Sequence, residues 1–188
     1  LALSQNPRNP AALLGLGNVL FRQGNLSGAL QYYVQALDQD PQSLGAWMGS
    51  GQALLLNGSA EQSLPFFERA IALDDNSSSA WQYLGEAQIL TGGTDNALRS
   101  FEKALVLDPG SNESLLGMAD ALYKMANYSM AAAYYEQAIA GGMQSARAYR
   151  GLANSLCAGG DFESALPLFD RSLLLEPNDI DSLLGKGL

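Results

Sequence analysis

A period of 34 residues runs through the whole chain and constrains its fold more than any other feature. Shifting the sequence by this number aligns a column of small residues: Gly17, Gly51, Gly85, Ala119, Ala153 and Gly187. The same shift aligns the pattern A-x3-[FY]-x2-A, with serine allowed for alanine, in five copies without insertion or deletion. Its aromatic members are Tyr33, Phe67, Phe101, Tyr135 and Phe169. Such a period predicts stacked repeats, because one repeat cannot bury its apolar face alone.

Each repeat divides into two helices. In the first copy, Leu13, Leu16 and Leu20 have helical spacing, and the break that follows at Gly24-Asn25 is a typical helix end. A second apolar stripe follows and closes at Asp40-Pro41, since proline disfavours helix in the residue before it. We therefore predict an all-α fold, an α-solenoid of stacked antiparallel helix pairs forming a right-handed superhelix with a concave face.

The chain resembles the tetratricopeptide repeat (TPR) family. The resemblance rests on the period, on the A-x3-[FY]-x2-A cores, and on the openings Trp47…Ser50-Gly51 and Trp81…Leu84-Gly85, and it covers essentially all 188 residues. We expect both tryptophans to be largely buried. The pattern predicts five complete repeats, 10–43, 44–77, 78–111, 112–145 and 146–179. Residues 1–9 are expected to end a preceding repeat and residues 180–188 to start a sixth, as in an excerpt of a longer array.

The resemblance implies an adaptor that binds peptides or partner helices on its concave face. On the first helix of each repeat, the stripe turned away from the packing stripe gives a polar ladder of Asn18, Gln52, Glu86, Asp120 and Asn154. Its apolar and mixed flanks are Leu14, Met48, Gln82, Leu116 and Arg150 on one side, and Phe21, Leu55, Ile89, Tyr123 and Cys157 on the other. We expect this stripe to form a largely apolar groove, although individual side chains could instead fill the interior of the superhelix.

Cations gather near one end of the predicted groove. Arg147 and Arg150 lie on one predicted helix, near Lys124, and Asn154 stands one turn beyond Arg150. This group resembles half of the carboxylate clamp with which some members of the family hold a peptide C-terminus; the alternative is simply solvated arginines. The other half of the clamp is absent, since Gly185 offers no amide side chain.

Composition argues against several other functions. Without histidine and with a single cysteine, Cys157, the usual hydrolytic triads and zinc sites cannot be built. We therefore expect no enzyme activity, no metal and no cofactor. The net charge of −9 disfavours nucleic acid, and no apolar run approaches the ~20 residues that span a membrane. The lone cysteine favours a reducing, cytoplasmic location.

Two classes of function remain open. One is a binding module whose groove holds a peptide or partner helix. The other is a structural or regulatory array inside a larger protein, contacting neighbouring domains such as a catalytic glycosyltransferase domain, or stacking with copies of itself. Apolar residues at the two ends, among them Leu1, Leu3, Leu183, Leu184 and Leu188, predict weak head-to-tail self-association.

Overall fold

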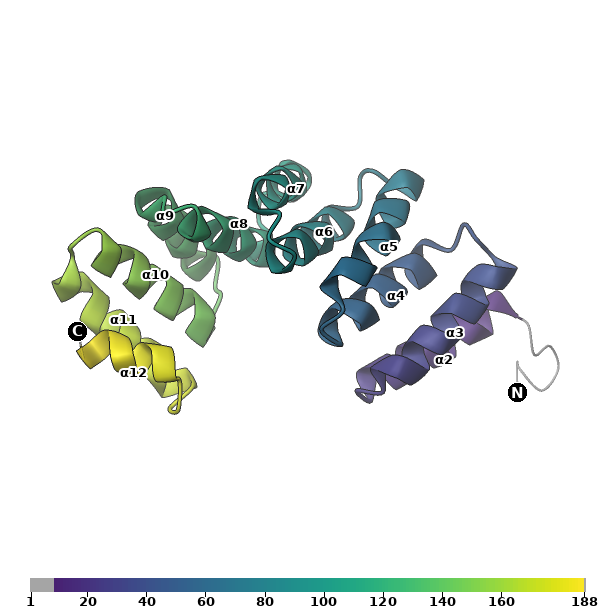
Figure 1. The fold of residues 1–188 in the computed structure, drawn as a ribbon, viewed down its shortest axis with the longest axis horizontal. Coiled ribbons are helices and arrows are strands. Elements are labelled where there is room, and N and C mark those ends of the chain that lie inside the picture. The colour runs from purple at the N-terminus through teal and green to yellow at the C-terminus, as the bar shows by residue number, and fades with distance from the viewer. Residues whose placement is uncertain (1–8, 188) are drawn as a thin grey trace. The chain divides into compact units, whose positions relative to one another are not determined.

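The computed structural model describes residues 9–187 and divides the chain into two compact units, Leu1–Gly93 and Thr94–Leu188. In the described part of the N-terminal unit, five helices pack against one another in chain order (Figure 1). They are α2 (Pro10–Arg22), α3 (Leu26–Gln39), α4 (Leu44–Leu56), α5 (Ala60–Leu73) and α6 (Ser78–Leu90). The alternate helices α2, α4 and α6 also contact one another, α2 with α4 and α4 with α6. The first helices of successive pairs therefore lie side by side.

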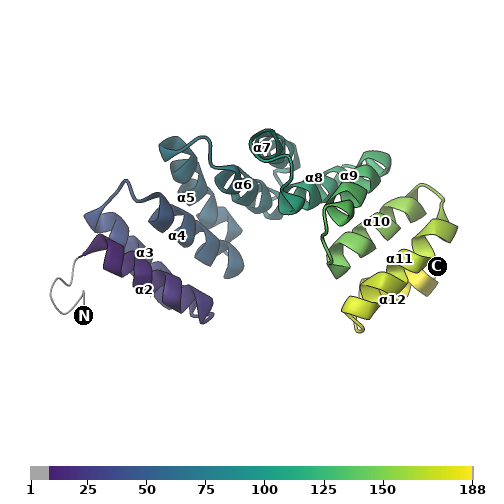
Figure 2. The same cartoon turned by 180° about the vertical axis from the view of Figure 1, so that it is seen from behind.

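The C-terminal unit repeats this arrangement with six helices in its described part. They are α7 (Thr94–Leu107), α8 (Asn112–Lys124), α9 (Tyr128–Ala140), α10 (Ala146–Ala158), α11 (Phe162–Leu175) and α12 (Ile180–Gly187). Here α8 contacts α10, and α10 contacts α12; Figure 2 gives the reverse view of both units. No strand occurs within residues 9–187. The prediction of an all-α fold of stacked helix pairs is confirmed.

A left-handed residue ends the first helix of a pair. Gly24 has a φ of 77°, which glycine adopts at little cost because it has no Cβ. In the fourth repeat Ala126 takes this place with a φ of 59°, and the amide of Asn127 donates to the carbonyl of Leu122 at 2.9 Å. The turn is thus kept, with an alanine in a conformation that favours glycine.

Trp47 and Trp81 are partly buried and each packs against a core cluster, which agrees with the prediction that they are largely buried. Their indole N–H groups donate to the carbonyls of Pro41 and Asp75, each at 2.9 Å. Each ring therefore lies against the turn that precedes its helix and keeps part of its surface in solvent. The physical reason is the polar N–H group, which needs a hydrogen-bond partner that the apolar core does not offer.

The aromatic column of the repeats forms the centre of each unit. The ring of Tyr33 is 2% exposed and lies between Gly17 of its own pair and Gly49 of the next pair. A Cβ added at Gly17 or Gly49 would lie 2.5 or 2.6 Å from ring atoms of Tyr33. The helices can therefore approach this closely only because both positions lack a side chain.

The structure reveals a second column of glycines that the sequence analysis did not identify. Its members, spaced by multiples of 34 residues, are Gly15, Gly49, Gly117, Gly151 and Gly185. All but Gly15 receive the aromatic ring of the preceding repeat. Tyr83 interrupts the column and stacks on Phe67, with ring centroids 5.7 Å apart and planes 13° from parallel. The column therefore marks where each repeat packs on the next.

Parts of the sequence prediction lie outside these observations. Residues 1–8, expected to end a preceding repeat, are outside the described residues, as is Leu188. The division at Gly93 falls between the two helices of the predicted repeat 78–111. The repeat boundaries and the right-handed superhelix stay predictions.

Candidate functional site

An open hollow of about 260 Å³ lies on the first-helix face of the N-terminal unit, between α2 and α4. Four residues of the predicted groove line it together, and the tyrosine that packs between the helices forms part of its wall. The lining residues are Asn18, Phe21, Arg22, Tyr33, Gly45, Met48, Gly49 and Gln52. The hollow thus combines two amide side chains, two large apolar side chains and one guanidinium group.

Tyr33 holds one of the polar side chains of this hollow in place. Its hydroxyl donates to Oδ1 of Asn18 at 2.9 Å, which links the second helix of the pair to the ladder on the first. Burial raises the pKa of Tyr33, so the hydroxyl stays protonated and remains a donor. The ring of Tyr33 is held between Gly17 and Gly49. Its hydrogen bond to Oδ1 therefore fixes the Asn18 amide and orients the Nδ2 donor.

The charge around the hollow is positive. Arg22 is exposed and has no ion-pair partner within residues 9–187. None of the residues lining the hollow carries a carboxylate. Phe21 and Met48 are half-buried and supply apolar contact area. The hollow can therefore bind a group that accepts hydrogen bonds and has an apolar stem.

The equivalent place in the C-terminal unit, between α8 and α10, is bridged by an ion pair. The guanidinium of Arg147 on α10 donates to Oδ2 of Asp120 on α8, and the hydroxyl of Tyr135 donates to Oδ1 of Asp120 at 2.5 Å. Burial, followed by the charge of Asp120 and its hydrogen bond, raises the pKa of Tyr135. The Arg147 side chain is 55% exposed and that of Asp120 only 16%. The pair therefore covers the carboxylate but leaves the arginine in contact with water.

Arg150 is paired as well. Its Nη1 lies 2.6 Å from Oδ1 of Asp179, the residue that precedes α12. Oδ2 of Asp179 accepts hydrogen bonds from Ser182 and, at 3.4 Å, from Ser172 of α11. Neither Arg147 nor Arg150 is thus a solvated arginine without a partner. Both bind carboxylates of their own unit, so an acidic ligand group would have to compete with Asp120 or Asp179 for them.

Three residues assigned to the groove are core residues in the structure. Leu55, Ile89 and Leu116 are 9, 9 and 7% exposed. Leu55 packs in one cluster with Phe67 and Leu84. The expectation that these three side chains offer a ligand surface is wrong. Leu55 and Ile89 lie near the ends of α4 and α6 on one flank of the stripe, and Leu116 lies in the first half of α8 on the other flank, so parts of both flanks turn inward.

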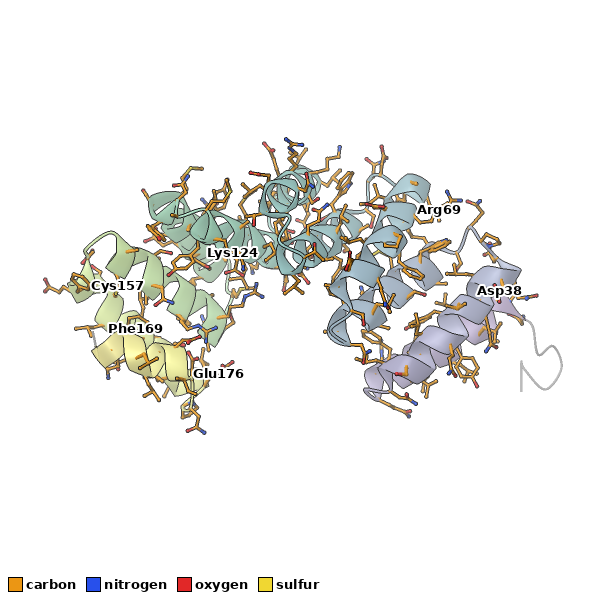
Figure 3. All side chains as sticks on the ribbon, in the orientation of Figure 1. Asp38, Arg69, Lys124, Cys157, Phe169 and Glu176 are labelled. Atoms are coloured by element: carbon orange, nitrogen blue, oxygen red, sulfur yellow. The ribbon has the colours of Figure 1, made fainter. Side chains whose placement is uncertain are left out.

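The other predicted groove residues are distributed along both units. Leu14 is half-buried and packs against the core cluster that contains Leu13 and the one that contains Tyr33. On α6 the side chain of Gln82 donates to Glu86 at 3.0 Å. In the C-terminal unit Tyr123, Arg150 and Asn154 are half-buried and Lys124 is exposed; Figure 3 labels Lys124 on α8 and Cys157 on α10.

Four contributors to the hollow escaped the sequence analysis: Arg22, Tyr33, Gly45 and Gly49. Gly49 belongs to the second glycine column. Tyr33 was assigned only to packing, although the hydroxyl that distinguishes tyrosine from phenylalanine in this column was a usable signal. Arg22 and Gly45 lie beside the predicted stripe, not on it. Their proximity follows from the α2–α4 contact, which the period of one helix does not specify.

The described residues contain no cluster of His, Cys, Asp or Glu that could hold a metal ion. Within the same residues, no helix is long and apolar enough to span a membrane. Cys157 is half-buried, and burial raises the pKa of its thiol, so it stays protonated.

The stacked helix pairs define a helical-repeat protein, which has a hollow on its first-helix face. Two family models, both described as tetratricopeptide repeat, match residues 20–89 and 116–182. The chain therefore belongs to the tetratricopeptide repeat family, as its sequence pattern predicts. Repeats of this family mediate protein interactions and are typically non-catalytic scaffolds. A search of curated proteins found no match.

Solved structures are similar to the chain along nearly its whole length. PilF of Pseudomonas aeruginosa is 24% identical with a TM-score of 0.86, covering 99% of this chain and 85% of its own. YrrB, described as a TPR protein with an unusual peptide-binding site, is 19% identical with a TM-score of 0.76, covering 100% and 96%. TTC0263 of Thermus thermophilus, a thermophilic TPR protein, is 20% identical with a TM-score of 0.75, covering 95% and 97%. At these identities the similarity establishes the fold.

Proposed function

We propose that this chain is a peptide-binding adaptor whose N-terminal unit holds a segment of a partner protein on its first-helix face. The observation that carries the proposal is the shared hollow: Asn18, Phe21, Met48 and Gln52, predicted from the sequence as groove residues, line one cavity. YrrB, a protein of the same fold, is described as having a peptide-binding site, which supports this class of ligand.

The chemistry of this face suits a peptide. An extended segment carries one backbone donor and one acceptor per residue, and the amides of Asn18 and Gln52 can serve both. Phe21 and Met48 offer apolar contact beside these amides. The Gln82–Glu86 pair lies on α6, which contacts α4, so a segment leaving the hollow in that direction meets further polar groups. The proposed adaptor has no catalytic activity of its own and works in the cytoplasm.

A peptide library displayed on phage and selected against the whole chain tests the proposal. Selected peptides are then synthesised, and their affinity is measured by fluorescence anisotropy. Met48→Glu places a charge in the hollow, and we expect it to weaken binding at least tenfold. The matched control is Gln35→Glu, which adds the same charge at an exposed position of α3 outside the hollow and should leave the affinity within twofold.

Because Met48 also packs against the neighbouring core, the helix content of each variant is checked by circular dichroism. Gln52→Ala, which removes an amide without adding charge, provides a second test and should also weaken binding. The proposal is overturned when no library peptide binds the wild-type chain, or when both hollow variants bind as tightly as the wild type.

A second candidate function, self-association, is favoured by the exposed apolar surface of α12. Leu183 is 52% exposed, whereas its counterparts Leu13 and Leu115 in other repeats are 3 and 7% exposed. Ile180 and Leu184 are 69 and 65% exposed. We propose that a second copy of the chain covers this surface in a head-to-tail contact.

Sedimentation over a concentration series tests the self-association. The mass of the wild type should rise with concentration, and Leu183→Lys with Leu184→Lys should suppress the rise. A control with the same added charge is Gln35→Lys with Gln62→Lys, at two exposed positions of the N-terminal unit. A wild type that stays monomeric up to millimolar concentration would rule this candidate out.

A further inference from the structure

The hollow between α2 and α4 has an equivalent position in the C-terminal unit, three periods further along the chain. A shift of 102 residues pairs the positions as follows: Asn18 with Asp120, Tyr33 with Tyr135, Gly45 with Arg147, Met48 with Arg150 and Gln52 with Asn154. The tyrosines act alike, since each hydroxyl donates to the polar residue on the first helix. The two places are therefore built on the same frame and differ in the side chains that fill them.

In the C-terminal unit this place has an occupant from the chain itself. Arg147 reaches from α10 to Asp120 on α8, and its guanidinium ends beside the carboxylate that Tyr135 also contacts. In the N-terminal unit the corresponding position is Gly45, which has no side chain, and the corresponding acceptor, Asn18, has no charge. Both the occupant and its counter-ion are thus missing, and an open hollow stands in their place.

The two places share a cation, Arg22 or its counterpart Lys124, but differ in the acceptor on the first helix. Asp120 gives the C-terminal one a carboxylate that suits a guanidinium. The N-terminal one has the cation Arg22 and the amides of Asn18 and Gln52, and no carboxylate among its lining residues. A cationic side chain entering it would be repelled by Arg22, whereas a terminal oxygen would meet amide N–H and guanidinium donors.

We propose that the hollow between α2 and α4 is a socket for one long side chain of the partner peptide, a Gln or a Glu. Arg147 is the chain's own occupant of the matching socket in the C-terminal unit. The side-chain oxygen of the ligand accepts from the amides and from Arg22, and its methylene groups lie against Phe21 and Met48. This inference rests on the proposed peptide binding and adds the chemistry of the anchoring residue.

The test copies the C-terminal arrangement into the N-terminal unit. The variant Gly45→Arg with Asn18→Asp recreates the Arg147–Asp120 pair, and Gly45→Arg alone serves as a second variant that keeps the bond between Asn18 and Tyr33. The control is Gln35→Arg, which adds the same side chain and charge at an exposed position of α3 outside the hollow. Filling the socket should weaken binding of a selected peptide at least tenfold, while the control stays within twofold of the wild type.

The same peptide is synthesised with Gln, Glu, Arg or Met at its anchoring position. The wild-type chain should bind the Gln or Glu form at least tenfold tighter than the Arg form, and the ratio of Gln to Glu separates the amide contribution from that of Arg22. Equal binding of all four forms, or unchanged binding to both filled variants, overturns the inference. If Met48→Glu still abolishes binding in that case, the peptide site stands and only the socket falls; absence of any binding peptide removes both.

Discussion

The second glycine column provides a test of what limits the approach of one repeat to the next. A Cβ added at Gly117 would lie 2.3 Å from the ring of Phe101, whereas at Gly15, the equivalent position in α2, it would meet nothing within 4 Å beyond its chain neighbours and the backbone of its own helix. Both glycines are helical. The substitutions Gly117→Ala and Gly15→Ala therefore make the same chemical change in a crowded and in an open environment.

The two effects that compete at these positions have known sizes. Alanine is favoured over glycine inside a helix by about 0.8–1.0 kcal/mol, and this gain applies to both variants. Overpacking a well-filled contact costs about 1–3 kcal/mol. This cost applies to Gly117 alone, because only there would the added Cβ meet a fully buried ring, that of Phe101. We expect Gly15→Ala to raise the free energy of unfolding by ~1 kcal/mol. The free energy of unfolding of Gly117→Ala should be about 1–3 kcal/mol lower than that of Gly15→Ala.

Thermal unfolding followed by far-UV circular dichroism measures the difference. For chains of 150–250 residues, 1 kcal/mol corresponds to roughly 2–4 °C in Tm, so the two variants should differ by about 2–12 °C. Because repeat arrays do not always unfold in one step, hydrogen exchange of the amides in α8 gives a local readout. If Gly117→Ala proves as stable as Gly15→Ala, ring contact is not what excludes a side chain from this column.

Three further predictions concern single residues. Ala126→Gly should stabilise the folded chain by about 0.5–1 kcal/mol. It removes the cost of a left-handed alanine, ~1–2 kcal/mol, but it also gives the unfolded chain more conformational freedom. Hydrogen exchange of the Asn127 amide should become slower, and unchanged exchange would contradict the prediction. Ser50→Ala should stabilise the folded chain by ~1 kcal/mol, because the buried Ser50 hydroxyl has no hydrogen-bond partner within the described residues. Urea denaturation measures the change, and a loss of stability would argue against the prediction. Burial disfavours the charge of Asp179, but its hydrogen bonds and Arg150 outweigh this and lower its pKa, so the attachment of α12 should persist above about pH 4 and weaken as the pH falls further. Exchange of α12 amides measures this, and Asp179→Asn should abolish the pH dependence.

The sequence by itself determined the fold, because the information is local and repeated. A period of 34 residues, with glycine or proline at most of the breaks, specifies where each helix begins and ends. The side chains of Asn18, Phe21, Met48 and Gln52 were also predictable as a shared surface, since residues on one face of neighbouring first helices must meet once the pairs stack. Their use of one hollow follows from that stacking.

Only the tertiary structure decided which groove residues are accessible and which are occupied. Leu55, Ile89 and Leu116 share the predicted stripe but are buried, because the angle at which neighbouring helices lean together is not written in the period of either helix. The pairing of Arg147 with Asp120, 27 residues earlier, likewise depends on two helices lying side by side. Long side chains can reach several partners, and the packing of the backbone selects one of them. The lack of a side chain at Gly45 can be read from the sequence, but only the contact between α2 and α4 makes an open hollow there.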